Sequence, residues 1–113
     1  MAAPTPGRPV RGSRSGRPIM ALLDLLGRRW ALRVLWELRD GPLSFRELQQ
    51  RCDAMSPSVL NERLAELREA GIVELRPGGG YRLTSEGRSL GQQLLALDRW
   101  AKRWAARSRK AAA

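Results

Sequence analysis

The 113-residue sequence contains no histidine and a single cysteine, Cys52. These absences exclude an intramolecular disulfide and a zinc site built from cysteine and histidine ligands. Acidic residues are also scarce, with 11 against 21 basic ones. Long apolar runs are missing too, because the longest uncharged apolar stretch, residues 19–23, is far too short to cross a bilayer. We therefore expect a soluble cytoplasmic protein with no metal ion and no membrane partner.

The sequence also lacks the groups on which most enzymes depend. It has no phosphate-binding glycine loop, and no potential nucleophile has an evident base nearby. We therefore expect no enzymatic activity and no cofactor. The net charge of +10 instead favours a polyanionic partner such as nucleic acid. The excess of positive charge lies towards the two ends of the chain. Residues 1–18 contain four arginines and no acidic residue, whereas residues 44–70 are slightly acidic.

Composition divides the chain into an arm, one domain and a tail. Residues 1–18 are rich in proline, glycine and serine, which predicts a disordered basic arm. Residues 19–108 have helical apolar periodicity and predict one folded domain, followed by a flexible tail over residues 109–113. The arm either reaches into a DNA minor groove or makes no defined contact. Its arginines are Arg8, Arg11, Arg14 and Arg17.

Residues 44–70 have the pattern of two helices joined by a tight turn. Ser44 and Glu47 match a capping box at the start of the first helix. Ser56 and Pro57 then pair an expected N-cap with the first helical position, where proline is favoured. The second helix is predicted to run to the end of this stretch, with leucines on its buried side. This arrangement is typical of a helix-turn-helix.

Two helices are expected before this motif, one ending near Gly27 and one over residues 30–39. A β-branched stretch, a Pro-Gly-Gly-Gly turn and a second apolar stretch predict a β-hairpin, or wing, over residues 72–84. Thr84 is expected to cap a last helix over residues 85–108, whose apolar residues recur at alternating four- and three-residue spacings. The expected fold is mainly α with a small β-hairpin: a winged helix-turn-helix with a C-terminal dimerisation helix.

A helical wheel places short polar side chains opposite the leucines of the second motif helix. Such groups suit phosphates and base edges in the major groove, and arginines of the preceding helix and the wing suit phosphates or the minor groove. The predicted DNA-binding residues are Arg46, Ser56, Ser58, Val59, Asn61, Glu62, Arg63, Arg76 and Arg82.

Some of these assignments have alternatives. Glu62 either accepts a hydrogen bond from cytosine or pairs with Arg46, Arg63 or Arg68, and we favour the ion pair because such pairs are common on helix faces. The two wing arginines either contact DNA or keep the hairpin soluble. The pattern as a whole also fits a winged-helix module that binds protein or RNA through its basic tails.

The last helix contains more large apolar residues than so small a core can bury. They pack within the subunit or form a homodimer seam, and we favour the seam. Cys52, just before the turn, is either a redox-sensitive thiol or, as we favour, a small apolar filler. The residues assigned to the dimer interface are Leu22, Leu26, Leu90, Leu94, Leu97, Trp100, Ala101 and Trp104.

Several short motifs, in this order and spacing, resemble the HxlR-type family of bacterial winged helix-turn-helix regulators, which has a MarR-like architecture. The resemblance spans residues 18–100 and implies a homodimer that binds a pseudo-palindromic operator in double-stranded DNA and regulates transcription. Some family members sense electrophiles through a cysteine before the first helix, where this chain has Arg17 and Pro18. The sequence defines no small-molecule effector. The motifs include Leu26-Gly27-Arg28-Arg29-Trp30, Phe45-Arg46-Glu47-Leu48, Ser56-Pro57, Ala70-Gly71-Ile72-Val73 and Leu83-Thr84-Ser85-Glu86-Gly87.

Overall fold

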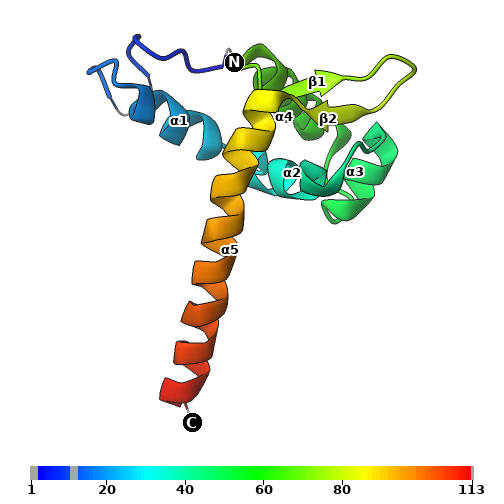
Figure 1. Cartoon of the computed structure of the whole chain (residues 1–113). Helices are drawn as coiled ribbons and strands as arrows, with labels where there is room; N and C mark the ends of the chain where they lie inside the picture. Colours follow the sequence, from blue (N-terminus) through cyan, green and yellow to red (C-terminus); the bar gives the residue numbers. More distant parts are fainter. Residues whose placement is uncertain (1–2, 11–12, 113) are drawn as a thin grey trace.

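A computed structural model describes residues 3–10 and 13–112. Figure 1 shows a globular part from which most of the last helix projects. The predicted mainly α fold with one β-hairpin is confirmed. In chain order the elements are α1 (Pro18–Leu26), α2 (Ala31–Glu37), the 3₁₀-helix η1 (Leu38–Asp40), α3 (Phe45–Arg51), α4 (Pro57–Glu69), β1 (Val73–Leu75), β2 (Tyr81–Leu83) and α5 (Ser85–Ala112).

The core lies where the leucine faces of α2, α3 and α4 meet. Leu35 on α2, Leu48 on α3 and Leu64 on α4 are among its fully buried side chains. Leucines three and four residues apart share one face of a helix, so α4 presents a continuous apolar stripe to the other two helices. Val73 and Leu83 of the hairpin close one side of this core.

Local geometry sets the ends of the first two helices. α1 begins at Pro18, one residue earlier than predicted, because proline is favoured at the first helical position. The helix predicted over residues 30–39 is divided: α2 ends at Glu37, and the chain continues as η1 up to Gly41. A 3₁₀ turn commonly tightens the end of an α-helix in this way.

A Schellman motif ends α4 and directs the chain into the hairpin. The N–H of Ile72 donates to the carbonyl of Leu67 at 2.9 Å, and the N–H of Gly71 donates to the carbonyl of Arg68 at 3.0 Å. Gly71 has a φ of 77°, a left-handed conformation that glycine adopts without a steric penalty.

The hairpin is tied to the helix-turn-helix by a bridge that the sequence did not indicate. β1 and β2 pair antiparallel, with Val73 opposite Leu83. The backbone of Tyr81 also pairs with Leu43, whose N–H donates to the Tyr81 carbonyl at 3.0 Å and whose carbonyl accepts from the Tyr81 N–H at 2.8 Å. The wing therefore has a fixed position relative to the start of α3.

α5 begins as predicted but ends later. The hydroxyl of Thr84 caps it by accepting from the N–H of Gly87 at 3.0 Å. A side chain at Gly87 would overlap the carbonyl oxygen of Ile72, so glycine allows α5 to lie directly against the hairpin. The helix extends to Ala112, which corrects the predicted end at residue 108 and the tail that was expected to be flexible from 109. Alanine and arginine favour helix, and basic side chains stabilise its C-terminal end.

The described part of the predicted disordered arm has local structure. Val10 and Ser13 form a β-bridge, and the N–H of Gly7 donates to the carbonyl of Gly16 at 2.9 Å, which closes a loop. The N–H of Ala3 donates to the Glu69 carboxylate at 3.2 Å, at the end of α4. Arg8, Arg14 and Arg17 are exposed, and Arg11 lies outside the described residues.

Candidate nucleic-acid interface

α3 and α4 form the predicted helix-turn-helix, and its first helix has the predicted capping box. The hydroxyl of Ser44 accepts from the N–H of Glu47, and the Glu47 carboxylate accepts from the N–H of Ser44, both at 3.0 Å. Two hydrogen bonds with Ser44 lower the pKa of Glu47 below its ordinary value. The bond to the Ser44 backbone has the larger effect and the bond to its side chain the smaller one. The carboxylate thus supports α3 in its ionised form.

The turn between α3 and α4 has an unusual backbone. Asp53 and Ala54 both lie in the left-handed region, with φ values of 56° and 55°. The side-chain amide of Gln49 donates to the carbonyl of Met55 at 2.9 Å and holds the turn closed. Side chains other than glycine adopt this conformation at a cost, so the surrounding contacts hold the turn in place.

The outer face of α4 presents the short polar side chains that the sequence predicted there. Ser58, Asn61 and Glu62 are exposed. The expected capping bond from Ser56 to the backbone is not formed within the described residues, because its hydroxyl lies 3.0 Å from the hydroxyl of Ser58 instead. The N-terminus of α4 is thus exposed beside two hydroxyl groups, an arrangement suited to a phosphate.

Two residues predicted to face DNA point elsewhere. Val59 packs partly against the core. The guanidinium of Arg63 donates to the carbonyl of Arg29 at 2.7 Å and pairs with Glu66. Arg63 also lies 3.8 Å from Glu62, which is the ion pair expected for that carboxylate. Arg63 therefore contacts its own chain on the side of α4 that faces the α1–α2 loop.

The arginines outside α4 differ in their contacts. Arg46 on α3 and Arg76 at the end of β1 are exposed. Arg82 on β2 donates to the carboxylate of Glu74 on β1 at 2.9 Å, and both side chains are a little over two-fifths exposed. This cross-strand pair stabilises the hairpin and leaves Arg76 as the less restrained cation of the wing.

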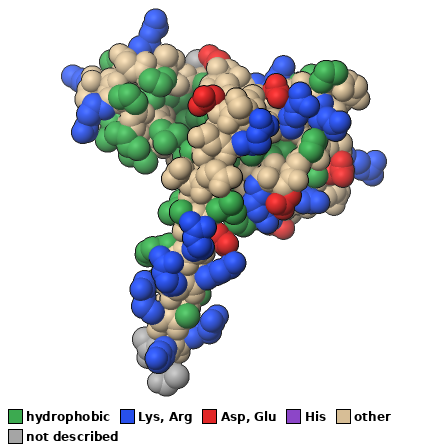
Figure 2. All heavy atoms as spheres, in the orientation of Figure 1, with side chains coloured by type: hydrophobic (Ala, Val, Ile, Leu, Met, Phe, Trp, Pro, Cys, Tyr) green, Lys and Arg blue, Asp and Glu red, His purple; other side chains and the backbone are tan. Residues whose placement is uncertain are grey.

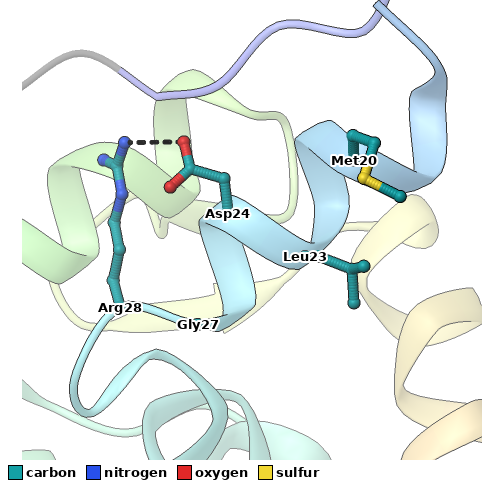
Figure 3. Close-up of a pocket in the computed structure, with 5 residues that line it drawn as sticks. All are labelled: Met20, Leu23, Asp24, Gly27 and Arg28. Atoms are coloured by element: carbon teal, nitrogen blue, oxygen red, sulfur yellow. Dashed lines mark hydrogen bonds and ion pairs between the residues drawn. The ribbon is translucent and has the colours of Figure 1, made fainter. Parts of the chain in front are cut away.

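A nearly buried ionic cluster connects α4 to α1, and sequence reasoning missed it. Glu66 on α4 is 4% exposed and pairs with both Arg63 and Arg28. Arg28 also reaches Asp24 on α1, 3.5 Å away, and Figure 3 shows these two side chains pointing toward each other. They form one edge of an open hollow of about 260 Å³ whose lining includes Met20. The sequence indications were the four-residue spacing of Asp24 and Arg28 and the three-residue spacing of Arg63 and Glu66, each of which allows a local ion pair.

The predicted dimer seam divides into a buried and an exposed part. Leu94 belongs to the core and Leu90 packs against it, so these two side chains stabilise the subunit itself. Beyond them Leu97 is 59%, Trp100 49% and Trp104 56% exposed. The two tryptophan rings stack, with centroids 5.8 Å apart.

The other side chains assigned to the seam lie nearby or on α1. Ala101 is exposed, whereas Leu22 and Leu26 on α1 are half-buried. An apolar groove of about 410 Å³ lies between α2 and α5, lined in part by Leu32, Trp36 and Leu97. Exposed apolar side chains that the sequence analysis did not assign are Ile19, Leu23, Leu32, Leu75 and Leu95.

Cys52 is fully buried at the end of α3. Burial raises the pKa of its thiol, and Arg33 only partly opposes this effect. A buried, protonated thiol is a poor nucleophile. The structure therefore supports the apolar filler and not the redox-sensitive thiol.

The family model described as HxlR-like helix-turn-helix matches residues 25–109. The chain belongs to this family. In the HxlR-like chain, α3, α4 and the β1–β2 hairpin are the helix-turn-helix and the wing of a DNA-binding transcriptional regulator. The members of this family are transcriptional regulators and not enzymes.

Relatives of the HxlR-like chain agree with this assignment. The uncharacterized HTH-type transcriptional regulator YvaP of Bacillus subtilis is 32% identical over 73% of this chain and 82% of its own. The crystal structure of quinone-bound YodB from B. subtilis has a TM-score of 0.68 at 34% identity, over 76% of this chain and 97% of YodB. A possible HxlR family transcriptional factor from Thermoplasma volcanium has a TM-score of 0.69 at 25% identity, over 78% and 84% of the two chains.

Within residues 3–10 and 13–112, no helix of the HxlR-like chain is both long enough and apolar enough to span a membrane.

Proposed function

We propose that the chain binds operator DNA sequence-specifically as a homodimer, with α4 as the recognition helix in the major groove and the wing beside the phosphate backbone. The observation that supports this most directly is the exposed polar face of α4, where Ser58 and Asn61 project from a helix whose opposite face is core. Hydroxyl and amide groups of this kind hydrogen-bond to phosphates and base edges. Ser56 adds a further hydroxyl at the N-terminus of α4.

The wing and α3 would add contacts to the DNA backbone. Arg46 on α3 and Arg76 on the wing are exposed cations suited to phosphates. Arg82 would contribute less because it pairs with Glu74. We leave Val59 and Arg63 out of the proposed interface because their side chains contact their own subunit.

The homodimer is supported by the exposed apolar side chains of α5. Most of the stability of a helix in a protein comes from packing of its apolar face, and the projecting part of α5 leaves that face uncovered within the subunit. Leu97, Trp100 and Trp104 lie on one face and continue the stripe that Leu90 and Leu94 begin inside the subunit. A second copy would cover this face and, through two-fold symmetry, present two recognition helices to a pseudo-palindromic site.

Selection from a random duplex library tests the proposal, because the operator need not be known beforehand. Repeated rounds at physiological salt should enrich one pseudo-palindrome whose half-sites lie about one helical turn apart, roughly 10 bp. The selected duplex should then bind at least about 1,000-fold more tightly than a scrambled one. Failure to enrich any motif, with equal affinity for all duplexes, would contradict the proposal that the chain binds DNA sequence-specifically. Preferential binding of RNA would favour the alternative nucleic-acid module.

A further inference from the structure

We propose that the basic face of the projecting part of α5 binds a second DNA duplex, so that one protein holds two DNA segments together. This inference rests on the proposed binding of operator DNA by α4. It concerns a part of the molecule that the helix-turn-helix and the wing leave unused. Its basis is the composition, orientation and position of residues 99–110.

The charge of this segment is entirely positive. Asp98 is the last acidic residue of the sequence, and six basic residues follow it within residues 99–110. All six side chains are exposed. Within the described chain, only Lys102 among them forms an ion pair, with Asp98 at 3.1 Å. The six are Arg99, Lys102, Arg103, Arg107, Arg109 and Lys110.

Five of the six basic side chains lie on the side of α5 away from Leu97 and Trp104, whereas Arg107, seven residues after Trp100, shares the face of that tryptophan. Residues four and seven apart share a helix face, so Arg99, Arg103 and Lys110 form one row. Leu97 and Trp104, also seven apart, form a row on the other side. Covering the apolar row with a second subunit therefore leaves the basic row open to solvent.

The position of this face separates it from the operator-binding elements. α5 starts beside the wing and runs away from it, and Figure 1 shows the wing and the C-terminal end of α5 far apart. Lys110 lies sixteen residues beyond the core residue Leu94, about 24 Å along the helix at 1.5 Å per residue. A straight duplex on α4 and the wing would pass at the other end of the molecule, so the basic face would meet a different segment of DNA.

The chemistry of the face suits a phosphate backbone better than other anions. Figure 2 shows lysine and arginine side chains along the projecting part of α5. A row of cations with Asp98 as its single acidic neighbour along the helix attracts phosphates regardless of sequence. An anionic membrane would require Trp100 and Trp104 to insert into lipid, whereas these are the side chains that the proposed dimer buries. A duplex requires only the basic face.

A two-duplex capture assay tests the proposal. A selected duplex is immobilised, the full-length protein is added, and retention of a labelled duplex of unrelated sequence is measured. Wild type should retain the label. The triple variant Arg99→Gln, Arg103→Gln, Lys110→Gln should retain at least about tenfold less and should bind the immobilised duplex within about twofold of wild type. In the variant, the plot of the logarithm of affinity for the second duplex against the logarithm of salt concentration should be less steep by about 3.

The matched control removes the same charge from the arm, as Arg8→Gln, Arg14→Gln, Arg17→Gln, and should leave the amount of labelled duplex captured per molecule of bound protein unchanged. Loss of binding to the immobilised duplex in the α5 variant would overturn the proposal, because the face would then contact the operator duplex itself. So would retention of phosphatidylserine vesicles or polyglutamate in place of DNA by the wild-type complex. Binding of the first duplex without capture of the second would refute only this inference, whereas failure to bind the first would refute the proposed function.

Discussion

Arg28 and Glu66 form an ion pair between the α1–α2 loop and α4, the proposed recognition helix, and their side chains are only 9% and 5% exposed. The same carboxylate pairs with Arg63, and Arg28 reaches Asp24 on α1. α1 carries part of the apolar surface assigned to the proposed dimer, and α4 carries the groups proposed to face the major groove. The orientation of one relative to the other therefore depends on a nearly buried contact between charges.

Removing this contact should destabilise the fold. Arg28→Met is expected to lower the free energy of unfolding by about 3 kcal/mol, because part of the buried Glu66 charge loses its partner. Urea unfolding followed by circular dichroism measures the change. Lys102→Met is the control: it breaks an ion pair in which the lysine is 76% exposed and should cost less than about 1 kcal/mol. If both variants lose the same free energy of unfolding, the burial of the Arg28–Glu66 pair does not determine its contribution to stability.

The capping box should make stability depend on pH. Since the folded state lowers the pKa of Glu47, the ionised carboxylate stabilises the fold above the ordinary glutamate value of about 4.3, and this contribution disappears as the pH falls through the lower folded value. Glu47→Gln should melt below wild type at pH 7, and the difference should narrow as the pH is lowered towards 2. Calorimetry measures both, and a difference independent of pH argues against the capping role.

The polar face of α4 should determine specificity. The double change Ser58→Ala, Asn61→Ala is expected to weaken binding to the selected duplex by at least about tenfold, because each lost base contact removes about 1–3 kcal/mol of discrimination. Binding to a scrambled duplex should change little. Fluorescence anisotropy compares the two, with Ser89→Ala, Gln92→Ala on the exposed surface of α5 as the control. Parallel losses on both duplexes would show that these groups do not face the bases.

The exposed row on α5 should hold the dimer together. Leu97→Glu is expected to give monomers at low micromolar concentration, because it places a charge in the apolar seam. Leu95→Glu changes a leucine of the same helix that lies on another face and should remain dimeric. Sedimentation velocity distinguishes the two species. A dimeric Leu97→Glu would move the interface elsewhere.

Cys52 should be unreactive in the folded chain. Burial keeps its thiol protonated above the ordinary cysteine pKa of about 8.5, so folding stability should decrease as the pH rises past that value. Iodoacetamide should modify the native protein at least about 100-fold more slowly than the urea-unfolded chain. Oxidant treatment should leave the DNA affinity of wild type equal to that of Cys52→Ala. A fast native reaction would reinstate the redox-sensitive thiol.

Residues with local partners were predictable from the sequence. The capping pair Ser44 and Glu47, the cap at Thr84 and the proline that begins α4 all act within one helical turn, so spacing alone reveals them. Arg63 was different. Its guanidinium is directed by Glu66 and by the carbonyl of Arg29, thirty-four residues away, and a helical wheel contains no information about that loop.

The sequence by itself determined the order of the elements, the leucine stripe of α4 and the polar positions opposite it, because helical periodicity and capping are local properties. It also determined that α5 has one apolar face. Only the tertiary structure decided where along that face burial within the subunit ends. Leu94 lies in the core, whereas Leu97 is exposed. That boundary depends on how far α2 and the hairpin reach along α5. Likewise, Glu66 is nearly buried because the α1–α2 loop brings Arg28 against α4, and no local pattern encodes that contact.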